Sequence, residues 1–138
     1  MIEVYPGIYY ENLLIEADMV IRSVGDANNT IIDGSLSRNF GSSIVIRPQS
    51  NSIHKPIVEI EGFGIKSGKG TDIVNNMGDE LTYEKVGGGL LVYVNSPKVN
   101  NCKFLNNGDN NIVGGNRGFI TKAELRYPLI SKTLGIIL

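Results

Sequence analysis

The chain of 138 residues has one cysteine, one histidine and no tryptophan. A single cysteine, Cys102, excludes an internal disulfide and any zinc site built from several cysteines. A single histidine, His54, excludes metal sites and reactions that need two imidazoles, and we interpret it as a surface-loop residue. No apolar run approaches the roughly 18 residues that cross a bilayer, so we expect no membrane span.

Neither sign of charge predominates, since 13 lysines and arginines stand against 14 aspartates and glutamates for a net charge of -1. Proteins that track a phosphate backbone usually carry a basic excess, so we do not expect a nucleic-acid partner. The first residues show no basic segment followed by the apolar run of a signal peptide. The hydrophobic share of 41% is enough for the core of one domain.

Glycine and asparagine are abundant instead, with 17 and 15 residues, and they separate short apolar runs. The runs are rich in valine, isoleucine, leucine and tyrosine, and no long segment keeps a helical period, so we predict strands. The predicted strands are residues 12–15, 19–21, 30–32, 44–46, 57–60, 90–94 and 99–105.

Short patterns recur along the chain at uneven intervals. IRS at 21–23 returns as IRP at 46–48, a shift of 25 residues. IDG at 32–34 returns as IEG at 60–62 and as VNN at 99–101, with shifts of 28 and 39 residues. Such self-similarity indicates stacked units that bury their faces against one another. The uneven shifts favour a coil of short strands whose connecting turns absorb insertions.

One position of the predicted repeat is occupied by Gly34, Gly62 and Asn101. Glycine and asparagine adopt a left-handed backbone conformation more readily than other residues, so we predict a bend with positive φ at all three. The apolar residues that follow two of these bends alternate between the inside and the outside in the same way. The matched pairs are Phe63 with Cys102 and Ile65 with Phe104.

Two segments depart from the repeat, which otherwise spans residues 1–120. Residues 69–87 are polar, charged and rich in turn formers, and we expect a surface-loop insertion there. Residues 121–138 lose the glycine and asparagine punctuation, and Pro128 prevents one straight helix. We predict a helix over 121–127 and a strand or cap over 130–138, so that residues 121–138 form a C-terminal cap or an oligomerisation segment.

The opening sequence VYPGIYYE at 4–11 has the pattern V-x-P-G-x-Y-x-E, and a strand-like segment follows at 13–15. NTIIDG at 29–34 and residues 90–105 continue the same pattern. On these motifs the chain resembles the right-handed parallel β-helix of the pectin-lyase-like superfamily over about residues 2–118. The resemblance implies an all-β fold, a right-handed parallel β-helix (solenoid) of about five short rungs with an irregular C-terminal segment.

The resemblance also bears on location and assembly. Superfamily members are mostly exported, which implies an extracellular or cell-surface place, but this chain shows no export signal and its compartment stays open. Members usually carry a helix and strands that cap the coil before the motif, whereas here Met1 adjoins it. An open first rung invites pairing with other chains. Three alternatives follow from this open rung. The C-terminal tail covers an end, copies of the chain form a homo-oligomer through the open β-helix ends, or the chain is part of a longer protein.

Four charged residues form the first candidate ligand-binding site. Asp33 and Glu61 share a repeat position, so we expect their carboxylates on adjacent rungs, about 5 Å apart. Such a pair could bind Ca²⁺ or act as acid and base on a sugar. Arg22 and Arg47 share another position, and in the alternative interpretation they balance the two acids at a solvated turn.

Two further candidates lie near the insertion. Residues 67–75 fit a stacked calcium-binding nonapeptide except that Ser67 stands in place of glycine, and Asp72 would be the metal ligand. The motif occurs once, so the alternative is a turn without metal. Exposed asparagines beside Tyr83 or Tyr93 could form a carbohydrate platform, whereas asparagines stacked on successive rungs would form structural amide ladders.

The resemblance implies a polysaccharide as partner. The pectinolytic motifs Asp-Asp, Gly-His-Gly and Arg-Ile-Lys are absent from the sequence. We therefore expect a non-catalytic β-helix scaffold or binding module, glycan-binding or surface-associated. The alternative is a polysaccharide lyase, esterase or hydrolase of the same superfamily.

Overall fold

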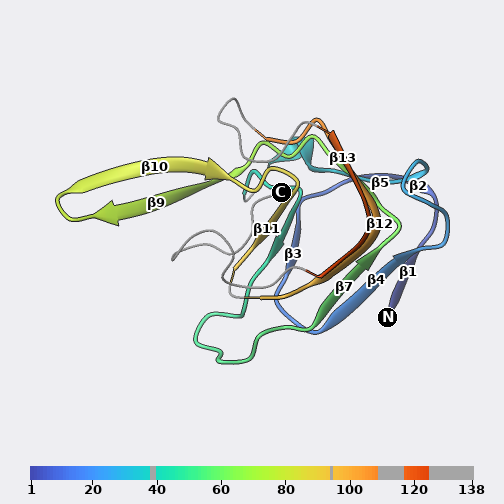
Figure 1. Ribbon diagram of the computed structural model, residues 1–138, viewed down its shortest axis with the longest axis horizontal. Helices are drawn as coiled ribbons and strands as arrows, with labels where there is room; N and C mark the ends of the chain where they lie inside the picture. Colours follow the sequence, from blue (N-terminus) through green and yellow to red (C-terminus); the bar gives the residue numbers. More distant parts are fainter. Residues whose placement is uncertain (38–39, 94, 109–116, 125–138) are drawn as a thin grey trace.

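A computed structural model describes residues 1–37, 40–93, 95–108 and 117–124 (Figure 1). Strands dominate these residues, and one short 3-10 helix, η1, interrupts them, so the predicted all-β class is confirmed. The strands and η1 are β1 (Ile2–Val4), β2 (Gly7–Tyr10), β3 (Leu13–Ile15), β4 (Met19–Ser23), β5 (Thr30–Asp33), η1 (Gly34–Leu36), β6 (Ile44–Ile46), β7 (Val58–Glu61), β8 (Gly64–Lys66), β9 (Thr71–Met77), β10 (Glu80–Val86), β11 (Leu90–Val92), β12 (Lys98–Leu105) and β13 (Arg117–Glu124).

Most strands lie in three parallel stacks around one interior (Figure 1). The first stack is β1, β4, β7 and the first half of β12, and the second is β2, β5, β8 and the second half of β12. The third stack is β3, β6 and β11. The chain visits the three stacks in the same order each time, and we call one such passage a circuit. The described residues make three circuits and enter a fourth with β12, against about five predicted rungs.

The register confirms one predicted repeat and corrects two. Ile60 pairs with Val99, as the shift of 39 residues predicts, and its other neighbour is Ile21. The shift of 28 is wrong because Ile32 pairs with Ile65 in the second stack. The shift of 25 is also wrong, since Ile46 belongs to the third stack. Similar tripeptides end strands of different stacks, so likeness of sequence did not reveal which strands are neighbours.

The predicted bend occurs at two of its three positions. Gly62 has φ 80° and Asn101 has φ 51°, and the Gly62 N–H donates to the Asn100 carbonyl oxygen over 3.0 Å. Gly34 instead opens η1 and is not among the described residues with positive φ. A Cβ at Gly34 would overlap Ser43, so this glycine permits close packing rather than a left-handed turn.

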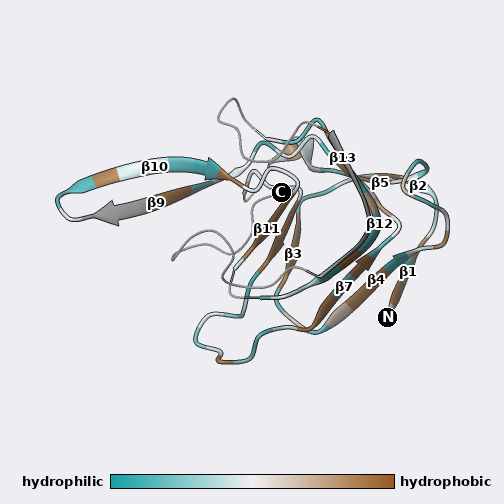
Figure 2. Ribbon diagram, viewed as in Figure 1, coloured by the Kyte–Doolittle hydropathy of each residue, from teal (hydrophilic) through white to brown (hydrophobic). Residues whose placement is uncertain are grey.

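The core is a cluster of buried apolar side chains from all three stacks, and much of β3, β4, β7 and β11 is coloured as hydrophobic in Figure 2. The predicted match of Phe63 with Cys102 and of Ile65 with Phe104 is confirmed by the pairing of β8 with β12. A second, smaller cluster lies on the outer side of the third stack and joins Val45, Leu91 and Val86. The fully buried members of the main cluster are Ile44, Ile46, Ile60, Ile65, Leu90, Val92, Val99 and Cys102.

Buried asparagines connect the circuits. Asn107 donates to the Ile65 carbonyl oxygen over 2.8 Å and accepts from the Gly68 N–H over 3.0 Å. Asn95 donates to the carbonyl oxygen of Pro56 over 2.8 Å. Because these amides satisfy backbone groups that would otherwise be buried without partners, their structural role agrees with the prediction. Their contacts run to the backbone of the preceding circuit and not to stacked amides.

The insertion predicted over 69–87 is an antiparallel hairpin of β9 and β10 rather than an irregular loop. It projects away from the three stacks (Figure 1). Its strand β10 is mostly hydrophilic or neutral, with Leu81 as an exposed apolar residue (Figure 2). The hairpin leaves the coil after β8 and returns before β11, so only its base touches the stacks.

The two ends of the stacks differ. β1, β2 and β3 each have one strand neighbour within the described part of the chain, whereas β12 is covered on its far edge by β13 in antiparallel pairing. The helix predicted over 121–127 is therefore wrong for 121–124, which belong to β13. Its remainder and the strand or cap predicted over 130–138 lie outside the described residues. No helix of the described residues has the length and apolar character to cross a membrane.

Candidate functional site

Asp33 lies at the end of β5, where its side chain caps η1 by accepting the Ser35 N–H over 3.0 Å. The Lys66 ammonium lies 3.3 Å from its other oxygen, and the side chain is 7% exposed. Burial would raise the pKa of Asp33, but the hydrogen bonds from Ser35 and the charge of Lys66 outweigh it and hold the pKa below its usual value. Asp33 is thus a buried, neutralised cap.

The predicted pairing of Asp33 with Glu61 is wrong. Glu61 ends β7 in the first stack, and its neighbours in register are Arg22 and Asn100. Asp33 lies in the second stack beside Lys66. Because the two acids belong to different stacks and each has its own cation, they do not form the expected acid pair.

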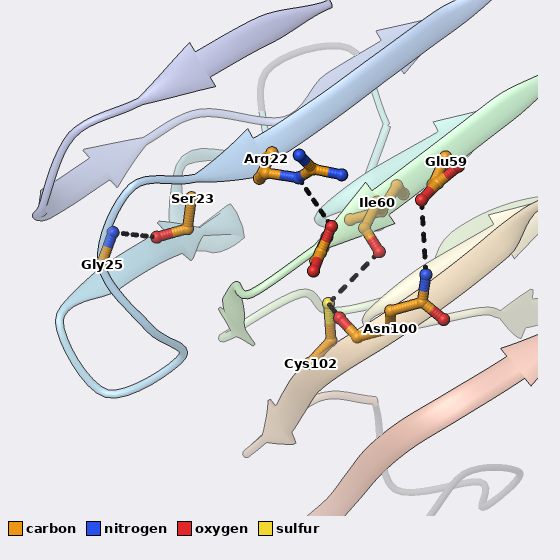
Figure 3. A network of polar contacts seen from close by, with 8 residues as sticks. Arg22, Ser23, Gly25, Glu59, Ile60, Asn100 and Cys102 are labelled. Atoms are coloured by element: carbon orange, nitrogen blue, oxygen red, sulfur yellow. Dashed lines mark hydrogen bonds and ion pairs between the residues drawn. The ribbon is translucent and has the colours of Figure 1, made fainter.

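A polar ladder runs along the outer face of the first stack (Figure 3). The Arg22 Nε lies 2.7 Å from a Glu61 carboxylate oxygen, and the Asn100 amide donates to Glu59 over 3.5 Å. In register the ladder follows the order Glu3, Arg22, Glu61, Asn100, so that acid and base alternate in its first three members. Exposed pairs of this kind add little stability, about 0–1 kcal/mol each.

Arg47 does not stack on Arg22, contrary to the prediction. It follows β6 in the third stack, and its Nε lies 2.8 Å from a Glu16 carboxylate oxygen. The two arginines therefore balance two separate acids on two faces of the molecule, and neither contacts Asp33.

Asp72 lies at the base of the hairpin, opposite Lys85 in the β9–β10 register. Its carboxylate is 3.6 Å from the Lys85 ammonium. The described residues contain no group of three or more histidine, cysteine, aspartate or glutamate side chains that could hold a metal ion. Residues around Asp72 thus do not support the predicted Ca²⁺ site, and the cation beside Asp72 is a lysine.

A polar hollow of about 310 Å³ opens beside Asp72. We call it the hairpin-base hollow. Its floor is closed by backbone, because the Lys69 N–H donates to the Gly41 carbonyl oxygen over 2.7 Å and a Cβ at Gly41 would overlap Gly70. The residues that line it are Ser37, Phe40, Gly41, Lys69, Gly70, Thr71, Asp72 and Lys85.

Hydroxyl groups strengthen the same wall. The Thr71 and Ser42 hydroxyl oxygens lie 2.7 Å apart, and the Ser42 N–H donates to the Thr71 oxygen over 3.3 Å. Ser42 is buried and also donates to the Val86 carbonyl oxygen over 3.3 Å. These bonds fix the start of β9 and the end of β10 to the segment before β6, so the base of the hairpin is held to the coil.

The hollow combines positive charge with an aromatic face. Lys69 and Lys85 stand against the single carboxylate of Asp72, which leaves an excess of one positive charge in the lining. Phe40 is half-buried and packs on the second cluster, so its ring is supported from behind. A lining with cationic, hydroxyl and aromatic groups suits a ligand that carries anionic groups on an amphipathic ring.

The predicted aromatic residues have other places. Tyr83 is 71% exposed on β10 and does not line the hollow. Tyr93 is half-buried in the second cluster, where burial raises its pKa against the opposing charge of Arg47. Sequence reasoning missed Phe40, Lys69 and Lys85 as site residues, because they converge only through the pairing of β9 with β10.

Cys102 and His54 are the remaining nucleophilic or titratable residues considered, and both make contacts within the fold rather than forming a site. Cys102 is fully buried, contacts the Asn100 carbonyl oxygen at 3.2 Å, and burial raises its pKa to about 11 (Figure 3). His54 lies on an exposed loop, as predicted, with its Nε2 2.7 Å from Asp18. The N–H of Ile57 and the His54 contact both lower the pKa of Asp18.

Comparison with protein families, with characterised proteins and with solved structures finds no match for this chain. The class that its strands define is all-β with parallel sheets.

Proposed function

We propose that the chain is a right-handed parallel β-helix of the pectin-lyase-like type that binds an acidic polysaccharide, without catalysis, in the hairpin-base hollow. Three parallel stacks that the chain visits in fixed order support the β-helix interpretation. Inward apolar positions that coincide from circuit to circuit support it further.

The observation that carries the binding proposal is the meeting of Lys69, Lys85 and Phe40 around one hollow of about 310 Å³. A sugar ring offers an apolar face that packs on an aromatic side chain and hydroxyls that bond to serine, threonine and backbone groups. A carboxylate on the sugar gains charge-assisted bonds from lysine ammonium groups. The volume is at the lower end of ordinary ligand pockets, which begin at about 300 Å³, and fits a single sugar unit.

The paired state of the candidate acids supports a binding role over the alternative of a polysaccharide lyase, esterase or hydrolase. Asp33 is neutralised by Lys66, Glu61 by Arg22 and Asp72 by Lys85. A glycosidase of ordinary mechanism needs two carboxyl groups flanking one bond, about 5–9 Å apart, and one of them must take up a proton. Asp33, whose pKa is lowered by the hydrogen bonds of Ser35 and by Lys66, is poorly suited to the proton-donating role, because these contacts favour its ionised form.

Titration calorimetry with an oligosaccharide of uronic acid, and with the neutral oligosaccharide of the same linkage, tests the proposal. We expect binding of the acidic ligand only, weakened by salt. Lys69→Gln and Lys85→Gln should each raise Kd by about tenfold, the effect of losing one charged hydrogen bond. Lys55→Gln, which removes an exposed lysine from a separate loop, should leave Kd unchanged.

Equal binding of both oligosaccharides, or an equal effect of all three lysine variants, would contradict the assignment to the hollow. Release of reducing ends or of unsaturated products during long incubation would favour the enzyme alternative. Circular dichroism of each variant establishes that a loss of binding does not come from a loss of fold.

A further inference from the structure

The first end of the three stacks is apolar, and no described strand covers it. Ile2, Ile21, Ile60 and Val99 occupy one ladder position in successive circuits. Ile21 is 5% exposed and the next two are fully buried, whereas Ile2 is 48% exposed. A hollow of about 340 Å³ opens at this end, and its lining includes Ile2, Val4, Tyr9, Leu13 and Ile15 from all three stacks.

The sheets also have open edges at this end. Within the described part of the chain, β1, β2 and β3 each have a strand neighbour on one side only. Their outer edges carry N–H and carbonyl groups in the spacing of a sheet, which is a template for a further strand. An apolar end framed by three open edges is completed by another layer of strands.

The charges of the two ends are opposite. Residues 1–21 contain four acids and no lysine or arginine, while the described residues 96–108 and 117–124 contain four lysines and arginines against one acid. This asymmetry identifies the occupant, because an acidic edge is matched by a basic one and not by a second acidic edge.

The geometry points to a second copy of this chain as the occupant, and we propose that copies stack end to end, with β1 and β2 of one copy beside β13 of the next. β13 already occupies the far edge of β12, and within the described residues its other edge has no strand neighbour and lies in the same ladder positions. The stack of strands would then continue from one molecule into the next with an antiparallel junction.

The ladder positions at this junction are complementary. The polar ladder Glu3, Arg22, Glu61, Asn100 continues with Lys122 on β13, so the next member is Glu3 of the next copy. Cross-strand pairs of opposite charge stabilise sheets, and like charges in that position destabilise them.

The other positions of the junction agree with this arrangement. The ladder of Ile2 ends at Ala123, so two apolar positions become neighbours there. The register position of Tyr10 continues through Asp33 and ends at Arg117 on β13. In the proposed junction, the Arg117 position of one copy is therefore the neighbour of the Tyr10 position of the next copy. Tyrosine and arginine form favourable cation–π pairs.

Contact between two first ends is the competing arrangement, and the charges disfavour it. It would bring Glu3 and Glu11 of one copy near the same acids of the other, while Arg22, the register neighbour of Glu3, is already paired with Glu61. A head-to-tail contact has no such repulsion. Because a head-to-tail interface leaves one free end on each side, it generates chains of copies rather than a closed dimer.

Sedimentation velocity of the full chain, from micromolar to hundreds of micromolar protein, tests the proposal through charge reversal. We expect wild-type protein to form species larger than a dimer as concentration rises, and high salt to weaken them. Glu3→Lys and Lys122→Glu should each raise the dissociation constant by more than about tenfold, since each places like charges opposite one another. Glu80→Lys, the same charge change on the exposed hairpin, is the matched control and should associate as wild type does.

Mixing provides the decisive arm. The first variant has a positive charge at position 3 and the second a negative charge at position 122, so opposite charges would again meet at a junction between the two variants. An equimolar mixture of Glu3→Lys and Lys122→Glu should therefore associate although neither does so alone. Wild-type protein that stays monomeric over the whole range would overturn the proposal. So would dimers that Glu3→Lys disrupts and Lys122→Glu leaves intact, because that pattern belongs to two first ends in contact.

Discussion

Replacing Ile60 by alanine tests whether the three stacks share one continuous core. Ile60 lies on β7 between Ile21 on β4 and Val99 on β12, and none of its surface is exposed. Its side chain points into the cluster that all three stacks build. A cavity at this position therefore opens in the middle of the ladder, where the layers on either side hold it open.

The expected cost is about 3–4 kcal/mol of unfolding free energy. The lost methyl and methylene groups contribute about 2.4 kcal/mol at about 0.8 kcal/mol each. The residual cavity adds to this, and measured costs of isoleucine-to-alanine changes in cores are about 2–5 kcal/mol. With a urea dependence of about 1–3 kcal/mol per molar, the midpoint of unfolding should fall by at least about 1 M.

Urea unfolding followed by far-ultraviolet circular dichroism measures this change. Ile57→Ala is the control, because Ile57 is the same residue type on the same segment but is 74% exposed. Its cost should stay within about 0.5 kcal/mol. A cost below about 1 kcal/mol for Ile60→Ala, or equal costs for both variants, would refute the stacked core.

A double-mutant cycle sharpens the test with milder changes. Ile60→Val and Val99→Ala alter neighbours in one ladder, so they should couple by at least about 0.5 kcal/mol. Ile60→Val and Leu91→Ala lie in different clusters and should be additive within about 0.3–0.5 kcal/mol. Coupling in the second pair and not in the first would contradict the register of β7 on β12.

Two further measurements follow from single buried groups. The lowered pKa of Asp33 means that its ionised form stabilises the fold above the pKa of the unfolded state, and that this stabilisation is lost as pH falls through the folded-state pKa. The stability of Asp33→Asn should therefore depend less on acidic pH than that of wild type, while Glu80→Gln on the hairpin should follow wild type; parallel curves for all three would contradict the buried ion pair. Cys102, fully buried with a pKa raised to about 11, should resist a thiol reagent at mildly alkaline pH until urea unfolds the chain, and rapid labelling of native protein would place it at the surface.

The strands could be predicted from the sequence because their signal is local. Short runs of branched residues between glycine and asparagine coincide with β3, β4, β5, β6, β7, β11 and β12 to within a few residues. The bend at Gly62 and Asn101 could also be predicted, since positive φ restricts the residue types that follow a strand. β1, β2, β8, β13 and the hairpin strands β9 and β10 were not among the predicted strands, because none of them is a run of branched residues set off by glycine and asparagine.

The neighbours in space could not be predicted as well as the strands. Asp33 and Glu61 each follow an inward-facing isoleucine and precede a glycine. This similarity suggested that the two acids occupy the same position of the repeat. The structure separates them because Asp33 ends β5 in the second stack, whereas Glu61 ends β7 in the first stack. A position in a stack depends on the sum of all preceding connections, so one misplaced insertion moves a residue to another face.

The distribution of charge partners explains where function can reside in such a fold. On the stack faces, Arg22 pairs with Glu61 and Lys66 pairs with Asp33. Each ion pair joins residues of adjacent circuits, so these charges are balanced by neighbouring strands of the stacks. Among the described residues, charged side chains without a partner on a neighbouring strand occur at an insertion and at an open edge of the stacks. Lys69 beside the hairpin and Glu3 at the first edge occupy such places, and each has room for a group from another molecule. In a molecule built of stacked strands, we therefore expect a ligand or another copy to bind where the stacking is interrupted.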